Sequence, residues 1–315
     1  AWIYHNGKQF STNGKSLEMD TIPFMPIELV DTERHKNNFD IFRDDYREIL
    51  PTIQMIAMRG CPYTCDFCSE RSELVYTNGR SIDNILEEIE LRKQQGFKAI
   101  FFDDSTFGAY RSKQGNILDL LQSLSETGMK FGSLNRFNHL QTSRAIQPYV
   151  DAGFDYVYCA IEQFDDSALR EMSKGQQKAQ IERSMEQLNQ HSLKVGVSLL
   201  YGFPFETEDS IRATLDFTQR WSQNGTIVLV SESALSYHPG TPTGRGQSLN
   251  FNRTPPNIGH PFNRFEEGQW YHPDHVTAQY LDNILKMSET RFKDVMVRYR
   301  HSWHADHGYL LNGAG

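Results

Sequence analysis

The stretch Met58-Arg-Gly-Cys-Pro-Tyr-Thr-Cys-Asp-Phe-Cys-Ser69 holds three of the four cysteines of this chain within eight residues. Cys61, Cys65 and Cys68 follow the spacing C-x3-C-x2-C, so one short loop offers three thiolates. Most electron-transfer clusters are closed by four cysteines. Three ligands leave one iron of a 4Fe–4S cluster open, where it can bind a small molecule and pass it an electron. The spacing therefore predicts such a cluster, with Cys61, Cys65 and Cys68 as its ligands.

A zinc site is the competing interpretation of these cysteines. Structural zinc takes four ligands, usually supplied as two pairs. No second pair follows at the usual distance, because His35 and His139 stand alone. A disulfide framework fits poorly, since four cysteines in 315 residues, three of them clustered, do not staple a large domain. Cys159 lies inside an apolar run and is expected to be a small core residue.

Apolar runs of strand length alternate with segments of helical spacing along most of the chain. Ile82, Ile85 and Ile89 follow Ser81, a residue type that caps helix N-termini, and Gly96 ends that pattern. Such alternation predicts βαβ units and a parallel sheet. Strands are expected at 53–58, 99–102, 131–134, 156–161, 193–201 and 226–230. Helices are expected around 81–96, 117–128, 143–152, 181–188 and 207–215.

Five runs of the sequence resemble, in order, those of radical S-adenosylmethionine (SAM) enzymes of the cobalamin-dependent, class B methyltransferase-like subgroup. The cysteine loop carries the strongest resemblance, with the aromatic Phe67 just before its last cysteine. The runs are Arg59–Cys68, Phe102–Phe107, Ala160–Gln163, Gly202–Thr207 and Pro239–Thr241. The resemblance implies an α/β fold, a partial parallel (β/α)6 barrel of radical SAM type with a C-terminal helical and loop extension. Chemistry in parallel barrels collects at the carboxyl ends of the strands, where the runs fall.

The resemblance also implies residues that bind SAM. Phe67 is expected to pack near the adenine, or else only within its loop. Asp103 and Asp104 end a strand with side chains on opposite faces, so one can accept a bond from the SAM amine or ribose while the other caps a turn. Turn formation by both is the structural alternative. Arg136 can reach the SAM carboxylate with two N–H groups, or form a surface ion pair.

Further along the chain, Glu162 follows an apolar strand, where a carboxylate needs a partner. The resemblance implies that it binds the ribose hydroxyls, and the alternative is a structural ion pair. Gly202 and Pro204 are expected to bring backbone close to the nucleoside, although a plain strand-to-helix turn would look the same. Tyr237 and His238 follow the sixth expected strand and are candidates for contact with the substrate.

Three segments are expected: a connector at 1–50, the radical SAM core at 51–245, and a C-terminal lid and helix at 246–315. The helix of the last segment is expected over 276–292, where apolar residues recur at helical spacing. In the resembled subgroup the connector follows a cobalamin-binding domain. Cobalamin, if this protein uses it, is therefore expected from a domain outside these residues.

The expected function is reductive cleavage of SAM at a 4Fe–4S cluster, with modification of an unactivated carbon of a small molecule or peptide by methylation, rearrangement or cyclisation. A methylthiotransferase-like RNA modifier and a non-enzymatic zinc-binding module are the alternatives. An external electron donor such as flavodoxin or ferredoxin is implied. The formal charge of −8 argues against a nucleic-acid partner. No apolar run is long enough for a membrane span, and cluster cysteines predict a reducing, cytoplasmic setting.

Overall fold

The computed structural model describes most of the chain between the cluster loop and the sixth expected strand. The described residues are 2–5, 8–11, 18–29, 43–44, 48–70, 77–235, 241–243, 276, 278–293 and 295–300. Tyr237 and His238, the candidates for substrate contact, lie outside these residues. No helix of the described part of the chain is both long and apolar enough to cross a membrane.

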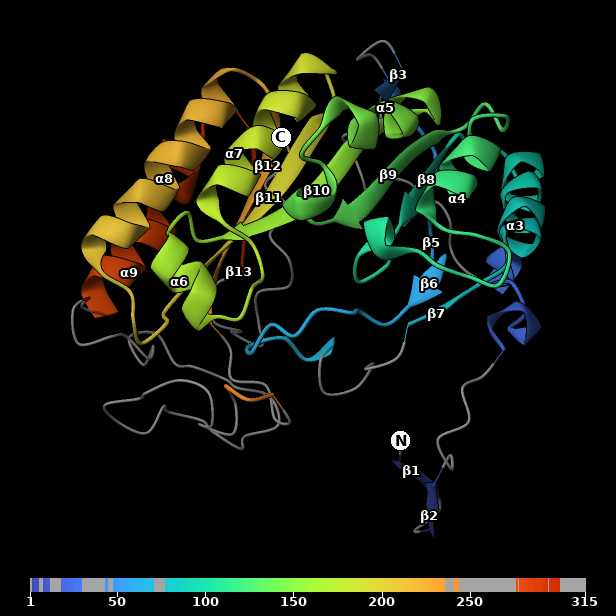
Figure 1. Cartoon of the computed structure of the whole chain (residues 1–315), viewed down its shortest axis with the longest axis horizontal. Coiled ribbons are helices and arrows are strands. Elements are labelled where there is room, and N and C mark those ends of the chain that lie inside the picture. The colour runs from blue at the N-terminus through green and yellow to red at the C-terminus, as the bar shows by residue number, and fades with distance from the viewer. Residues whose placement is uncertain are drawn as a thin grey trace.

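A seven-stranded sheet with the order β13-β12-β11-β10-β9-β8-β5 forms the centre of the fold, and all its neighbouring strands are parallel. Its strands are β5 (Thr52–Met55), β8 (Ala99–Phe102), β9 (Lys130–Asn135), β10 (Phe154–Glu162), β11 (Lys194–Tyr201), β12 (Ile227–Ala234) and β13 (Met296–Arg300). The order places β5 and β13 at the two edges of a curved sheet (Figure 1). The six predicted strands and the α/β fold are confirmed.

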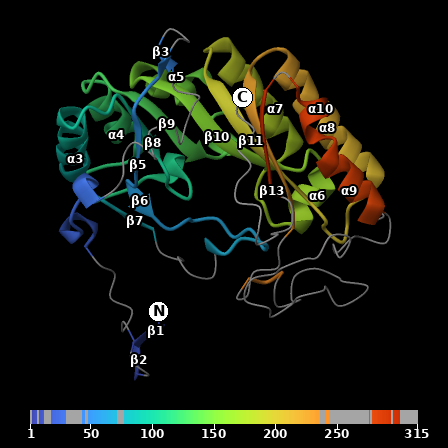
Figure 2. The same ribbon diagram turned by 180° about the vertical axis from the view of Figure 1, so that it is seen from behind.

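Helices cover the outer side of this curve, from α3 at one end to α8 and α9 at the other (Figures 1 and 2). They are α3 (Ile82–Gln94), α4 (Ile117–Leu124), α5 (Ser143–Asp151), α6 (Asp166–Glu171), α7 (Lys178–Gln190), α8 (Glu208–Gln223), α9 (Ala278–Lys286) and α10 (Ser288–Arg291). Ser81 caps α3 by accepting a hydrogen bond from the Asn84 N–H, and Thr207 caps α8 through the Ser210 N–H. Both caps agree with the sequence.

Shorter elements complete the described chain. Three antiparallel strand pairs join β1 (Trp2–His5) to β2 (Lys8–Ser11), β3 (Arg43–Asp44) to β4 (Glu48–Ile49), and β6 (Met58–Arg59) to β7 (Asn78–Gly79). The 3-10 helices are η1 (Met19–Thr21), η2 (Ile27–Leu29), η3 (Phe107–Ala109) and η4 (Phe137–His139). Because η3 follows β8 and η4 follows β9, both lie at the carboxyl edge of the sheet.

The structure differs from the expected pattern near the C-terminus. The helix expected over 276–292 is divided into α9 and α10 by a break at Met287. The strand β13 was not predicted, and it pairs in parallel with β12. Its sequence, Met-Val-Arg-Tyr-Arg, holds two arginines in five residues and so lacks the apolar run by which the other strands were predicted. The short helix α6 was also missed, because six residues are too few to show a helical period.

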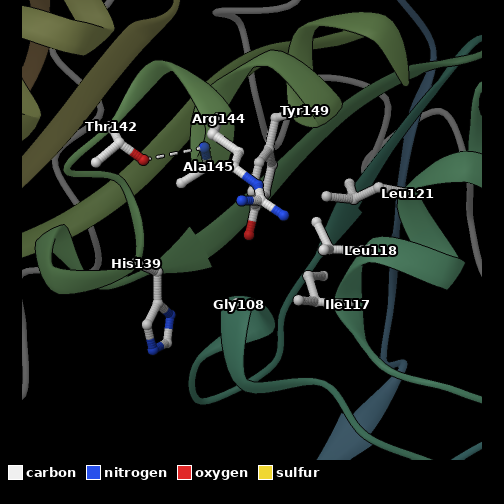
Figure 3. A pocket seen from close by; sticks show the side chains of 9 residues that line it. All are labelled: Gly108, Ile117, Leu118, Leu121, His139, Thr142, Arg144, Ala145 and Tyr149. Carbon is white, nitrogen blue, oxygen red and sulfur yellow. Dashed lines mark hydrogen bonds between the residues drawn. The ribbon is translucent and has the colours of Figure 1, made fainter.

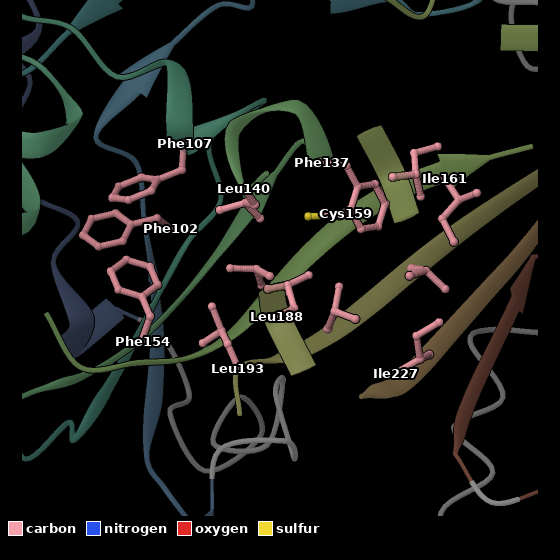
Figure 4. Close-up of a cluster of buried hydrophobic side chains, with 14 of the residues drawn as sticks. Phe102, Phe107, Phe137, Leu140, Phe154, Cys159, Ile161, Leu188, Leu193 and Ile227 are labelled. Atoms are coloured by element: carbon pink, nitrogen blue, oxygen red, sulfur yellow. The ribbon is translucent and has the colours of Figure 1, made fainter. Parts of the chain in front are cut away.

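The core between helices and sheet is rich in aromatic rings (Figure 4). Phe102 stacks on Phe107 at a centroid distance of 4.6 Å and on Phe131 at 5.8 Å. Phe154 packs against Phe107 and Phe131. Cys159 lies fully buried in the same core, which confirms its predicted role. Burial raises the pKa of the Cys159 thiol, so the group stays neutral.

The opposite face of the sheet carries a smaller cluster of Leu50, Ala99, Phe101 and Tyr156. Gly196 is required there, because a Cβ at this position would overlap the Tyr156 hydroxyl. Residues of β10 and β11 on this face, including Ala160 and Ser198, are half-buried. The face therefore combines aromatic rings with small side chains.

Candidate functional site

The cluster loop begins where β5 ends, and a buried carboxylate fixes its entry. Asp104, just beyond β8, accepts hydrogen bonds from the N–H groups of Ala57 (3.2 Å) and Met58. The side chain is fully buried, and burial raises the pKa of Asp104 to about 7. Arg80 donates to the carbonyl of Ile56 at 3.1 Å, close to the same turn. Asp104 therefore holds the backbone at the entry of the cluster loop, rather than the turn after its own strand that was expected for one of the two aspartates.

Asp103 differs from its neighbour as the strand geometry predicts. Its N–H donates to the carbonyl of Met55 at 2.8 Å, which continues the pairing of β8 with β5. The residue is exposed to solvent, but neighbouring atoms partly surround its carboxyl group, and this partial burial raises the pKa of the carboxyl. Of the two aspartates, Asp103 is the one whose carboxylate faces outward from the sheet edge.

The three cysteines of the loop are free thiols with different exposure. Cys65 is buried, and Cys61 and Cys68 are half-buried. Burial raises the pKa of Cys61, and it raises the pKa of Cys68 to about 11. Metal ligation requires the thiolate form, so a bound cation would offset this desolvation. Three thiols on one short loop are a donor set that fits iron in a 4Fe–4S cluster.

Cys61, Cys65 and Cys68 would be the protein ligands of a bound cluster. Among the described residues, no group of three His, Cys, Asp or Glu side chains is placed to hold a single metal ion. The loop turns between its second and third cysteines, where the Cys68 N–H donates to the Cys65 carbonyl at 3.2 Å. Gly60, with φ of 93°, allows the sharp entry into the loop.

The turn after α6 contacts the cluster loop through two hydrogen bonds to Asp66. The Asp66 N–H donates to the carbonyl of Met172 at 3.0 Å. The hydroxyl of Ser173 donates to the Asp66 carboxylate at 3.0 Å. Ser173 adopts a left-handed conformation with φ of 53°, which a tight turn of this kind requires. Nothing in the sequence predicts this contact, because it joins residues more than one hundred positions apart.

Arg136 contacts the cluster loop directly from the end of β9. One terminal N–H group donates to the Sγ atom of Cys65 at 3.6 Å, and the other donates to the carbonyl of Lys174. The guanidinium carbon lies 3.8 Å from the centroid of the Tyr63 ring. The side chain is buried, so the surface ion pair considered as an alternative is wrong.

Tyr63, between the first two cysteines, enters a polar network that the sequence did not reveal. Its hydroxyl lies 2.5 Å from Nε2 of His139, and the Asn138 amide donates to it at 3.1 Å. Nδ1 of His139 lies 3.2 Å from Oδ1 of Asn135, and that oxygen also accepts from the Arg136 N–H. The network therefore assigns the His139 proton to Nδ1 and makes Nε2 the acceptor for Tyr63.

The neutral state of His139 agrees with this assignment. Burial, with the nearby charge of Arg136, lowers the pKa of His139 to about 4. An imidazole with this pKa is uncharged at neutral pH. The interior end of the network is closed by Asn135, whose amide donates to the buried Tyr149 hydroxyl at 3.0 Å. Gly108 allows the close packing, because a Cβ there would overlap His139 and Asn135.

Glu162 occupies a strained position at the end of β10. Its φ is 59°, and the pairing register with β11 shifts between Ala160 and Glu162. Its carboxylate accepts from Nζ of Lys174 at 2.8 Å and from the Ser198 hydroxyl at 3.1 Å. The side chains of Glu162 and Lys174 are 9% and 5% exposed. A buried ion pair, the structural alternative for Glu162, is therefore present.

Phe67 joins the cluster loop to the turn after β11. Its ring meets Phe203 edge-on at a centroid distance of 5.7 Å, and Nζ of Lys174 lies 5.6 Å from the Phe67 centroid. Gly202 begins this turn with φ of 101°, and its N–H donates to the carboxylate of Glu206 at 2.7 Å. The half-buried Pro204 lies in the same turn. Phe67, Glu162 and Gly202 are thus brought to one region of the sheet edge.

Glu206 is a further buried carboxyl that sequence reasoning did not assign. It is fully buried and also accepts from the amide of Gln163. Burial raises the pKa of Glu206 to about 8. Its position in the run Gly202–Thr207 was a signal that could have identified it. Lys174 offered no comparable signal, since its partners become neighbours only in the folded chain.

A pocket of about 340 Å³ opens beside this network, between η3, α4 and α5 (Figure 3). Apolar side chains dominate its wall, and Arg144 and His139 add the charged and polar groups. The lining residues are Gly108, Ile117, Leu118, Leu121, His139, Thr142, Arg144, Ala145 and Tyr149. The pocket shares His139 with the network around Tyr63, so it adjoins the cluster loop.

Comparison with known proteins places these features in a family. The model of the radical SAM superfamily matches residues 55–218, more than half of the chain. The bacteriochlorophyllide d C-12(1)-methyltransferase of Chlorobaculum tepidum is 26% identical over 205 residues, covering 62% of this chain and 42% of that protein. The tRNA-2-methylthio-N(6)-dimethylallyladenosine synthase of Deinococcus radiodurans is 22% identical over 221 residues, with 64% and 43% covered.

Solved structures show the same fold. The radical SAM methyltransferase TsrM from Kitasatospora setae, with cobalamin and a 4Fe–4S cluster bound, has a TM-score of 0.56 at 16% identity, covering 75% of this chain and 47% of that one. The cobalamin-dependent radical SAM enzyme OxsB has a TM-score of 0.55 at 14% identity, with 76% and 41% covered. The chain thus spans less than half the length of these relatives. The family match and the three-cysteine loop at the edge of a parallel sheet show that the chain belongs to the radical SAM superfamily.

Proposed function

We propose that this chain is the catalytic core of an enzyme that cleaves SAM reductively and modifies an unactivated carbon of a small molecule or peptide. The reaction would be a methylation, a rearrangement or a cyclisation. The observation that carries the proposal is the set of three thiols, Cys61, Cys65 and Cys68, on one loop braced against the carboxyl edge of the sheet. When bound there, a 4Fe–4S cluster supplies the electron that breaks the C5′–S bond of SAM.

The residues around Phe67 would hold SAM next to the loop. Phe67, whose ring the buried Phe203 meets edge-on, would pack against the adenine, and the turn of Gly202 and Pro204 would bring backbone to the nucleoside. Asp103 offers an exposed carboxylate to the amine of SAM. Such fixed contacts would keep the reactive fragment oriented and shielded from water.

Glu162 would bind the ribose hydroxyls through an acceptor site that its present partners leave open, or by exchanging one of them. Its two oxygens accept from Lys174 and Ser198. The Ser198 hydroxyl is the weaker partner, because a neutral donor contributes less than a charged one. A ribose hydroxyl that replaces Ser198 would therefore leave the ion pair intact.

Two partners would act from outside the described residues. A one-electron donor such as flavodoxin or ferredoxin would reduce the cluster. Cobalamin, if used, would come from a domain beyond this chain. TsrM and OxsB, which share the fold, both bind cobalamin, and this chain spans less than half of each. We therefore expect the isolated chain to hold hydroxocobalamin weakly in equilibrium dialysis, and tight stoichiometric binding would contradict this expectation.

Methylthiolation is the second candidate. Relatives with this chemistry include the tRNA-modifying synthase of Deinococcus radiodurans and a ribosomal protein uS12 methylthiotransferase from Hydrogenobaculum, which is 23% identical over 173 residues. The formal charge of −8 disfavours an RNA substrate. Transfer of a methylthio group to an RNA or to uS12 would establish this candidate in place of the first.

The test is anaerobic reconstitution followed by chemical and spectroscopic analysis. We expect four irons and four sulfides per chain, a brown colour, and production of methionine and 5′-deoxyadenosine from SAM under dithionite. Alanine at Cys61, Cys65 or Cys68 should abolish iron binding, and Cys159→Ala is the control that should retain it. A colourless protein that binds zinc and cleaves no SAM would refute the proposal.

A further inference from the structure

Arg136 is a buried cation whose charge has no carboxylate partner among the described residues. The ion pairs at the sheet edge use other cations, since Lys174 pairs with Glu162 and Arg80 with Glu88. Arg136 is 7% exposed, so water cannot replace the missing counter-charge. Among the described residues, the thiol of Cys65 accepts an N–H hydrogen bond from the Arg136 guanidinium, and this thiol can become an anion.

The guanidinium is fixed in this position on several sides. Its second terminal nitrogen donates to the carbonyl of Lys174, and Nε donates to Oδ1 of Asn138 at 3.4 Å. The planar face lies against the Tyr63 ring at 3.8 Å. Tyr63 is itself held by His139. These contacts orient the planar guanidinium so that one terminal N–H group points at the sulfur of Cys65.

We propose that Arg136 is a positioning residue that raises the reduction potential of the cluster by donating a hydrogen bond to Cys65 Sγ. This inference rests on the proposed function. Reduction adds one negative charge to the cluster and its thiolates. A cationic donor to a ligating sulfur stabilises the more negative, reduced state, and hydrogen bonds to sulfur are among the factors that set these potentials. In this proposal Arg136 acts on the cluster through Cys65, and its predicted contact with the SAM carboxylate stays a separate prediction.

The test compares midpoint potentials of reconstituted proteins by potentiometric titration followed by electron paramagnetic resonance. Arg136→Gln removes the charge, and Arg136→Lys keeps a charge but loses the fork. Arg220→Gln is the matched control, because the exposed Arg220 pairs with Glu182 on the outer helices, away from the cluster loop. We expect Arg136→Gln to lower the equilibrium constant for reduction about tenfold, which is about 59 mV for one electron. The midpoint potential of Arg136→Lys should lie between those of the wild type and Arg136→Gln, and the potential of Arg220→Gln should equal that of the wild type.

Other results would contradict either the proposed function or the role of Arg136. A wild-type chain that binds no iron defeats the proposed function and this inference together. Full iron content with an unchanged potential in Arg136→Gln defeats the inference alone. Folded variants that lose the cluster show that Arg136 holds the cluster rather than tunes it, which also defeats the inference.

A measurement on the wild-type chain covers the case in which both variants fail to fold. Protein labelled with ¹⁵N in its arginine side chains is reduced and studied by electron–nuclear double resonance. A hydrogen bond from Arg136 to Cys65 predicts a hyperfine coupling to guanidinium nitrogen and an exchangeable proton that disappears in D₂O. Absence of both couplings in the loaded wild-type protein would overturn the inference.

Discussion

The buried pair of Glu162 and Lys174 permits a quantitative test of how the site is held together. The two side chains are 9% and 5% exposed and their charged atoms lie 2.8 Å apart. Removing one member of such a pair leaves the other charge buried, which typically costs about 3–5 kcal/mol. Replacing both by neutral residues removes that penalty. Glu162→Gln and Lys174→Met should therefore each destabilise the chain, and the double variant should be more stable than the sum of the two predicts.

Thermal unfolding of the metal-free chain measures this coupling. At roughly 2 °C per kcal/mol for a chain of this size, each single variant should lower Tm by about 6–10 °C. The double variant should recover at least part of this loss. Its free energy of unfolding should exceed the value expected from the sum of the single variants by about 2 kcal/mol or more. The pair Lys130 and Asp155, whose side chains are 49% and 46% exposed, is the control cycle, and its coupling should stay below about 1 kcal/mol.

The same variants separate the role of Glu162 in the fold from its role in binding. In reconstituted protein, Glu162→Gln should weaken SAM binding by about 1.5–3 kcal/mol, the scale of one hydrogen bond to a charged group, with iron content unchanged. Isothermal titration with SAM measures it. Additive effects on Tm would refute the buried pair as an energetic unit, and unchanged SAM affinity would refute the proposed contact with ribose.

Three further outcomes follow from the described residues. Burial raises the pKa of Asp104 from 3.8 to about 7 and of Glu206 from 4.5 to about 8, so the folded chain binds these protons more tightly than the unfolded chain. The protonated forms of Asp104 and Glu206 stabilise the fold fully below the unfolded pKa values, and this contribution is lost as pH rises toward 8. Tm should therefore fall from pH 5 to pH 8. An increase in Tm over this range would contradict the raised pKa values of the two carboxyls. Gly108→Ala should cost about 1–3 kcal/mol by pushing His139 away from Asn135, and a Tm equal to the wild type would exclude this packing. Tyr63→Phe keeps the ring under Arg136 but removes the bond to His139, so it should cost about 1–3 kcal/mol in Tm measurements while retaining the cluster; loss of iron would assign the hydroxyl to cluster binding.

The agreement between sequence and structure is best where the information is local. Ser81 and Thr207 cap the helices that their positions predict, because a side-chain oxygen needs only the N–H groups of the next turn. The central strands β8, β10 and β11 are rich in apolar residues, and that composition marks them as buried strands in the sequence. The cysteine spacing is local in the same sense, since all three thiols belong to one loop.

Elements with weak local signals were missed. The strand β13 is an edge strand with two arginines, and only its pairing with β12 identifies it. The break at Met287 divides a segment whose apolar spacing suits one continuous helix. Both features accompany contacts with β12: β13 pairs with it, and the Ser288 hydroxyl, just after the break, donates to Glu232. The sequence does not display such long-range contacts as a period.

The sequence by itself determined the family-type cysteine loop, the alternation of strands and helices, and the edge of the sheet at which polar residues gather. Only the tertiary structure decided the partner of each buried polar group: Asp104 with backbone, Glu162 with Lys174, and Arg136 with Cys65. The physical reason is the range of the interactions. Helix caps and strand periods involve neighbours in the chain, whereas a buried charge is satisfied by whichever group the folded sheet brings within about 3 Å of it, at any distance in sequence.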